Sequence, residues 1–187
     1  SVAGTNNRAV FSSTLPTNSS LELVATAAAF DVNTSLVYAK ATASNAGLIT
    51  LNGVANNGTT FTLSGGTYTS TLGQTYNGPV VLGADATLTG TQVTLASTVA
   101  GSASQYALTV NGPLTTGGSM TSMGAVTVSG LATLGGSQVT SARAQSYGGD
   151  VVLAGSGNTF LFSSALGTGA NMSFAGTLTA TTAVKAL

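Results

Sequence analysis

Short alternations of apolar and hydroxyl-bearing residues fill the chain from about residue 46 to its end. Thirteen segments of three to six residues show this period of two, and glycine or asparagine residues separate many of them. Such alternation between turn residues is typical of half-buried β-strands. The pattern therefore predicts strands that begin at residues 47, 59, 66, 79, 86, 91, 106, 125, 131, 150, 159, 172 and 177.

The spacing of these segments favours an all-β parallel β-helix, or β-solenoid, with an irregular N-terminal segment. Apolar centres lie about 6 to 9 residues apart, and the inward positions carry mostly small side chains, which suit a narrow coil. Three strands and their corners would make a coil of about 20 to 24 residues, so residues 46–187 would hold about six or seven coils in a rod of about 30 Å. The alternative is an antiparallel β-sandwich, in which the Asn-Gly pairs would form hairpin turns.

Residues 1–45 differ from the rest and contain four of the eight charged residues. We expect this segment to be an N-terminal cap or a subunit-docking segment, followed by the solenoid over residues 46–187. Its apolar residues stand among polar ones, which makes them the candidates for subunit assembly: Phe11, Leu15, Leu21, Leu23 and Val24.

Charge is scarce, at 4% of residues with a net charge of zero, whereas hydrophobic residues reach 43%. The absence of a basic cluster argues against nucleic acid as a partner. No apolar run is long enough to predict a membrane span. The chain does not begin with Met and shows no basic segment before an apolar stretch, so we expect a mature secreted form or an excised piece.

Few side chains could perform catalysis. Histidine and cysteine are absent, which removes the commonest general base and the usual zinc ligands. The four carboxylates are scattered along the chain, and we expect Asp85 and Asp150 to be corner residues rather than a catalytic pair. The sequence therefore predicts no enzyme, no cofactor and no metal site.

Tyrosines, threonines and asparagines suggest other kinds of site. Four tyrosines could form a platform for sugars, although packing between strands explains them better: Tyr68, Tyr76, Tyr106 and Tyr147. Arrays of threonines suggest the hypothesis of ice binding, but the spacing of these arrays along the sequence is irregular. Four sequons permit glycosylation, at Asn18, Asn33, Asn57 and Asn171.

One phrase occurs twice. Residues 73–90, with Gln74 and Tyr76 before a Val-Val-Leu run, are echoed 71 residues later by residues 144–161. Because no likely acid, base or metal ligand repeats, the echo indicates a rebuilt corner and strand. We expect Tyr76 and Tyr147 to mark equivalent places on coils about three turns apart.

The order Gln74-Thr75-Tyr76-Asn77-Gly78, followed by Leu82-Gly83-Ala84-Asp85, resembles the repeats of bacterial filamentous haemagglutinin-like exoproteins and related surface adhesins. The resemblance covers about residues 70–180. It implies a right-handed parallel β-helix that is exported and displayed as a fibre, with roles in adhesion and biofilm. The chain departs from the family pattern in its shortness and in its distinct first 45 residues.

These observations predict a structural protein of the bacterial cell surface, outside the cell. It would be a subunit or segment of a filament or adhesive fibre that assembles through β-edges and apolar contacts. Its partners would be copies of itself or neighbouring repeats of a longer chain, and host or surface glycans. The alternative function is a monomeric β-helical binding module for carbohydrate or ice.

Overall fold

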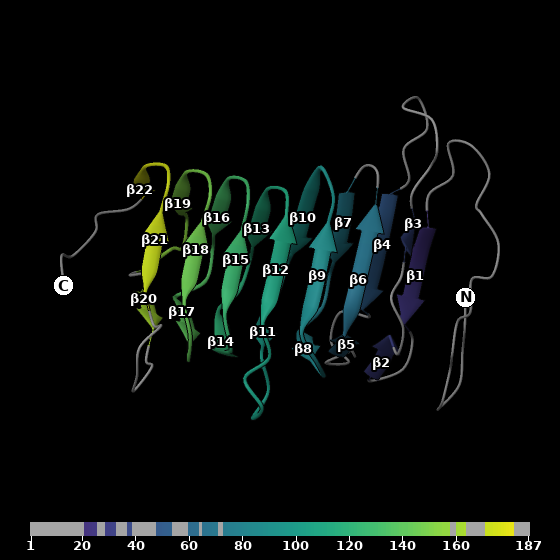
Figure 1. Ribbon diagram of the computed structural model, residues 1–187. Helices are drawn as coiled ribbons and strands as arrows, with labels where there is room; N and C mark the ends of the chain where they lie inside the picture. The colour runs from purple at the N-terminus through teal and green to yellow at the C-terminus, as the bar shows by residue number, and fades with distance from the viewer. Residues whose placement is uncertain are drawn as a thin grey trace.

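The chain forms a parallel β-solenoid, in which successive strands visit three sheets in turn (Figure 1). The computed structural model describes residues 21–25, 29–32, 37–38, 48–53, 60–63, 65–70, 73–157, 160–163 and 171–181. Every pairing among the described strands is parallel, and each sheet takes every third strand along the sequence. The predicted solenoid is confirmed, and the antiparallel sandwich is excluded.

Sheet A consists of β1 (Leu21–Ala25), β4 (Leu48–Gly53), β7 (Gly73–Tyr76), β10 (Gln92–Leu95), β13 (Leu114–Thr116), β16 (Ala132–Leu134), β19 (Val151–Leu153) and β22 (Leu178–Ala180). Sheet B consists of β2 (Ala29–Val32), β5 (Thr60–Leu63), β8 (Val80–Leu82), β11 (Val99–Ala100), β14 (Met120–Met123), β17 (Gln138–Ser141) and β20 (Phe160–Ser163). Sheet C consists of β3 (Val37–Tyr38), β6 (Gly66–Ser70), β9 (Ala86–Thr89), β12 (Leu108–Asn111), β15 (Val126–Val128), β18 (Gln145–Tyr147) and β21 (Met172–Phe174).

One coil is one strand from each sheet. In the middle of the rod, paired residues of neighbouring sheet A strands lie 18 to 21 positions apart in the sequence, as in Leu114 with Ala132 and Val93 with Leu114. These coils are at or just below the predicted length of 20 to 24 residues. The first described coil (β1, β2 and β3) lies within residues 1–45, so the three sheets extend into the predicted N-terminal segment. The role of that segment as a cap or a subunit-docking segment stays a prediction.

The interior is a narrow column of apolar side chains. Strands of only three or four residues point their first and third, or second and fourth, residues inward, because successive side chains of a strand face opposite sides. The inward side chains are mainly Val and Leu, such as Val93, Leu95, Leu114 and Val126, each at most 1% exposed. Burial of these rows against the coils on either side is the main stabilising contribution.

Between β5 and β19 the corner that joins β11 to β12 is the longest, and it projects from the rod (Figure 1). Within it Ser102 and Gln105 adopt positive φ, and the backbone N–H of Gln105 donates to the carbonyl of Ser102 at 3.1 Å. The N–H of Tyr106 then returns to the carbonyl of Gly101 at 2.9 Å. The extra residues are therefore closed into a turn, and the strands on either side keep their pairing.

Candidate functional site

Gln74 and Tyr76 form a buried polar pair inside the rod, where both are 1% exposed. The side-chain amide of Gln74 donates to the carbonyls of Tyr68 and Thr89, at 2.6 Å and 2.8 Å. These carbonyls belong to β6 and β9, which are neighbours in sheet C. The hydroxyl of Tyr76 donates to Oε1 of Gln74 at 2.7 Å. Gln74 thus links two coils across a corner, and Tyr76 completes its hydrogen bonding.

Gln145 and Tyr147 repeat this arrangement. The amide of Gln145 donates to the carbonyl of Val139 and to the hydroxyl of Ser141, at 3.2 Å and 3.1 Å. The hydroxyl of Tyr147 donates to Oε1 of Gln145 at 3.0 Å. In both pairs the glutamine bonds the carbonyl six residues before it, so the sequence echo preserves a local strand–corner–strand unit.

The two pairs nevertheless lie in different sheets. Gln74 and Tyr76 belong to β7 of sheet A, whereas Gln145 and Tyr147 belong to β18 of sheet C. The prediction that the tyrosines mark equivalent places on their coils is therefore wrong. The Gln-x-Tyr pair can occur at either corner because its shared hydrogen bond joins it only to the strand that directly precedes it. The rest of the coil does not contribute to this bond.

Burial makes these tyrosines sensitive to alkaline pH. It raises the pKa of Tyr76, with a smaller contribution from Tyr68, and it raises the pKa of Tyr147. The folded state keeps both protons where the unfolded chain loses them above its pKa of about 10. The free energy of unfolding should be constant below that pH and fall above it by about 1.4 kcal/mol per pH unit for each tyrosine.

Urea denaturation at several pH values from about 8 to about 11 measures this slope. Tyr76→Phe should reduce the slope by about 1.4 kcal/mol per pH unit, and Tyr147→Phe should have the same effect. An unchanged slope in Tyr76→Phe would contradict the assignment.

The tyrosines do not form a sugar platform. Tyr68, Tyr76 and Tyr147 are each 1% exposed, and Tyr106 is half-buried and packs on the core. The ring of Tyr147 stacks on Phe174 of the next coil, with centroids 5.4 Å apart. The expected packing role is confirmed for these rings.

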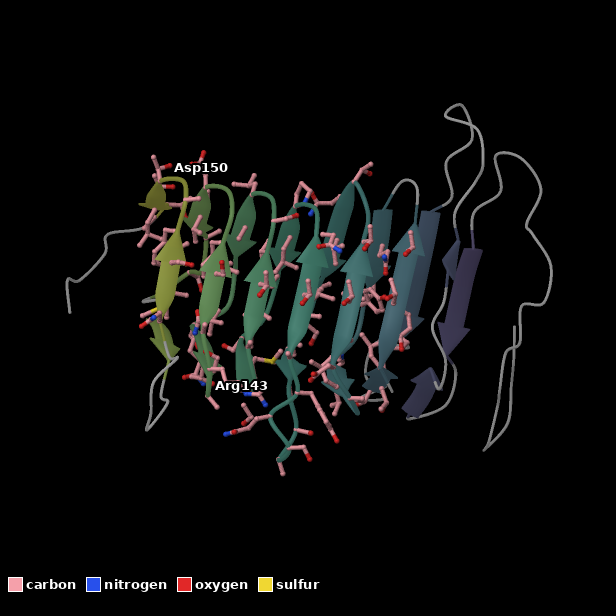
Figure 2. The ribbon with its side chains drawn as sticks, viewed as in Figure 1. Arg143 and Asp150 are labelled. Carbon is pink, nitrogen blue, oxygen red and sulfur yellow. The ribbon has the colours of Figure 1, made fainter. Side chains whose placement is uncertain are left out.

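Asp85 and Asp150 are corner residues, as predicted, and they lie at different corners. Asp85 precedes β9 and accepts the backbone N–H of Ala107 at 2.8 Å. Asp150 precedes β19 and accepts the N–H and the hydroxyl of Thr177, at 2.8 Å and 2.9 Å, and these bonds lower the pKa of Asp150. Each carboxylate thus accepts a hydrogen bond from the backbone of the next coil, at the corner equivalent to its own. Figure 2 shows Asp150 at the opposite edge of the rod from Arg143.

The described part of the chain contains no group of three or more Asp, Glu, His or Cys that could hold a metal ion. No helix capable of spanning a lipid bilayer occurs in it either.

A row of threonines runs along the outer face of sheet A, and we call it the sheet A ladder. Outward residues of successive strands are paired along the sheet, and this row consists of Thr75, Thr94, Thr115, Thr133, Val152 and Thr179. Neighbouring side chains in such a row lie about 4.8 Å apart, which is the spacing of the strands.

Sheet C carries a second row, the sheet C ladder. Its main column is Thr67, Thr87, Thr109, Thr127, Ser146 and Ser173. A second column two residues along the strands consists of Thr69, Thr89 and Asn111. The irregular spacing of the threonines along the sequence predicted that they would not form a regular hydroxyl face. This prediction is wrong, because corners of different length bring the threonines of successive coils into register.

The last described coil leaves its inward residues in sheets A and C exposed. Leu178 and Met172 are 50% and 43% exposed, although their partners in the preceding coil, Val151 and Gln145, are both fully buried. Phe174 packs only partly on the core. Among the described strands β20, β21 and β22 are the outermost of their sheets, so their outer backbone edges have no strand partner there. We call this surface the end face.

The residues proposed for assembly are placed only in part. Leu21, Leu23 and Val24 lie in β1, which pairs with β4, and Phe11 and Leu15 lie outside the described residues. Of the sequons, Asn171 is exposed just before β21, and its carbonyl accepts the N–H of Gln145. The other three, at Asn18, Asn33 and Asn57, lie outside the described residues.

No protein-family model, curated protein or solved structure matches this chain.

Proposed function

We propose that the chain is a non-catalytic structural segment of an extracellular bacterial filament or adhesive surface fibre, which lengthens by stacking coil on coil. The end face carries this proposal. Its inward row is apolar, and it continues the buried rows of the preceding coil position by position. Parallel strand edges surround that row, and an exposed edge of this kind is a template for further strands.

Stacking another coil on the end face would bury the side chains that are now exposed. Each buried Å² of apolar surface contributes about 25 cal/mol, and the strand edges would gain backbone hydrogen bonds. The partner is another copy of this chain or the neighbouring repeats of a longer one. The likeness to filamentous haemagglutinin-like adhesins supports placement on the bacterial surface and a role in contacts with host or surface glycans.

Leu178→Asp should weaken this association strongly, by at least about tenfold in the dissociation constant. The reason is that a carboxylate would be placed where the next coil must exclude water. Sedimentation and electron micrographs of the full chain measure the length of the particles. Leu131→Asp is the matched control, since Leu131 is 44% exposed but lies at a corner in the middle of the rod. Equal effects of the two substitutions, or a wild-type chain that never associates, would overturn the proposal.

A second candidate function rests on the sheet C ladder. Hydroxyl and methyl groups repeat about every 4.8 Å along the rod and about every 6.7 Å along the strands, on a face without charged side chains in its columns. Such an array suits an uncharged, ordered surface. Because Tyr68, Tyr76 and Tyr147 are buried and Tyr106 is half-buried, ice fits this face better than a carbohydrate that would stack on exposed rings.

If the sheet C ladder binds ice, the protein should be incorporated into a slowly growing ice crystal. Thr87→Leu combined with Thr109→Leu should reduce incorporation by at least about tenfold, because the larger side chains break the flat array. Thr121→Leu on sheet B, outside both ladders, is the control. Exclusion of the wild-type protein from ice would contradict this function and would leave the structural proposal intact.

A further inference from the structure

Asparagine is followed directly by glycine at four places in the chain, which begin at Asn52, Asn57, Asn77 and Asn111. An asparagine in this setting is prone to lose its side-chain ammonia, because glycine has no Cβ to obstruct the attack of its backbone nitrogen. Asn57 lies outside the described residues. The other three are placed differently in the rod, and their placement decides which of them can react.

The reaction needs a particular backbone geometry. The glycine nitrogen loses its proton and attacks Cγ of the asparagine, and the bond from Cγ to Nδ2 breaks so that ammonia leaves. Water then opens the cyclic imide, at either carbonyl, to aspartate or isoaspartate; one water is consumed, and nothing is oxidised or reduced. Ring closure brings the glycine nitrogen beside Cβ of the asparagine, whereas the extended backbone of a strand holds these two atoms apart.

Asn111 is held in strand geometry. It is the last residue of β12, where it lies opposite Thr89 of β9. Its Nδ2 donates to Oγ1 of Thr89 at 3.3 Å, and its carbonyl accepts the backbone N–H of Gly90 at 3.2 Å. The carboxamide is therefore directed toward the neighbouring strand, away from the next peptide bond.

The attacking nitrogen at this pair is also engaged. The backbone N–H of Gly112 donates to Oγ of Ser129 in the next coil at 2.9 Å. The carbonyl of Gly112 accepts the N–H of Gly130 at 3.3 Å. Ring closure at Asn111 would have to break these contacts with both neighbouring coils, so it requires local opening of the rod.

Asn77 has a different setting. It directly follows β7 and is exposed at the corner that leads to β8. Gly78 is the next residue of the same corner, and the chain enters sheet B only at Val80. Asn77 thus lies where the chain already turns, and water reaches its side chain. Asn52, in contrast, lies within β4 and is paired with Val24 of β1.

We propose that Asn77 is a site of spontaneous deamidation in the folded rod, and that Asn111 is protected from the same reaction until its coil opens. Each event replaces a neutral amide by a carboxylate, so the net charge falls from zero to minus one. Asn111 belongs to the sheet C ladder, and its protection keeps that face without charge. The inference goes beyond the proposed function, because the reaction does not depend on association between chains.

Peptide mass mapping of the folded, full-length chain after incubation in warm, mildly alkaline buffer tests the proposal. The Asn77 peptide should acquire the mass of the acid at least about tenfold faster than the Asn111 peptide, because reaction at Asn111 must await local opening. Equal rates, or faster reaction at Asn111, would overturn the inference.

The same incubation in concentrated urea shows whether the fold causes the difference. Both asparagines precede a glycine, so their rates should become similar once the strands are lost. If Asn111 stays as slow relative to Asn77 as in the folded chain, the local sequence protects it, and the structural inference is wrong.

Ser129→Ala tests the hydrogen bond that holds the attacking nitrogen. Ser129 is exposed, so the variant should keep the circular dichroism of the wild type. Deamidation of Asn111 should become several-fold faster, while that of Asn77 stays unchanged. Ser146→Ala is the matched control, because Ser146 lies in the same sheet and bonds Ser173 rather than this pair. An unchanged rate at Asn111 in Ser129→Ala would remove the protective role assigned to Ser129.

Discussion

Replacing Gly112 by alanine is expected to destabilise the fold by more than about 3 kcal/mol. Gly112 has a φ of +143°, which L-residues with a side chain rarely adopt. A Cβ there would overlap the carbonyl oxygen of Gly90 in the preceding coil. The next three coils carry a glycine at the equivalent corner: Gly130, Gly149 and Gly176. A Cβ on each of them would lie within 3 Å of the glycine in the coil before it, so the coils approach too closely there for a side chain.

Urea denaturation followed by circular dichroism measures the effect of Gly112→Ala. Gly157→Ala is the matched control, because a Cβ at Gly157 meets nothing within 4 Å. Its free energy of unfolding should stay within about 0.5 kcal/mol of wild type. Similar losses in the two variants would show that the glycine column does not limit the approach of the coils.

Gln74→Met should cost about 3 kcal/mol or more, although methionine nearly preserves the volume of the side chain. The substitution leaves the hydroxyl of Tyr76 without its acceptor, and it removes the donors to the carbonyls of Tyr68 and Thr89. Each buried polar group that loses its partner costs about 1 to 3 kcal/mol. Among the described residues every buried side-chain nitrogen and oxygen has a partner, so the interior offers no obvious replacement.

Gln92→Met in the next coil is the control for this prediction. Gln92 also donates from its amide, to the carbonyl of Val93 and the hydroxyl of Thr115, but it faces outward and water can replace it. We expect a change below about 1 kcal/mol. If Gln92→Met and Gln74→Met cost the same, burial of the amide is not what makes Gln74 important.

The fold class could be predicted because its dominant signal is local. All thirteen predicted strands are present, since alternation between turn residues reports a half-buried strand wherever it occurs. Four of the strands that were missed carry polar residues inward. In β7 and β18 the inward pairs are Gln-x-Tyr, and in β13 and β17 a threonine or a serine is buried. A search for alternating hydrophobic residues does not find a strand whose inward side chain is polar and is hydrogen-bonded across a corner.

The candidate surfaces were harder to predict than the strands. Both ladders depend on which residues are opposite one another, and corners of unequal length conceal that alignment in the sequence. The end face depends on where the stack stops, so Leu178 and Met172 look like any other apolar strand residues. The corner roles of Asp85 and Asp150 were predicted, because an isolated acid between short strands is typical of a turn.

The projecting corner between β11 and β12 has a practical consequence. Its residues close on themselves through Gln105 and Tyr106, while Val99 and Leu108 keep their places in the sheets. Foreign peptides should therefore be accepted at Ser102–Gln105 without a change in the shape of the rod. A rod built from many copies would therefore display an epitope inserted at this corner at regular intervals along one edge.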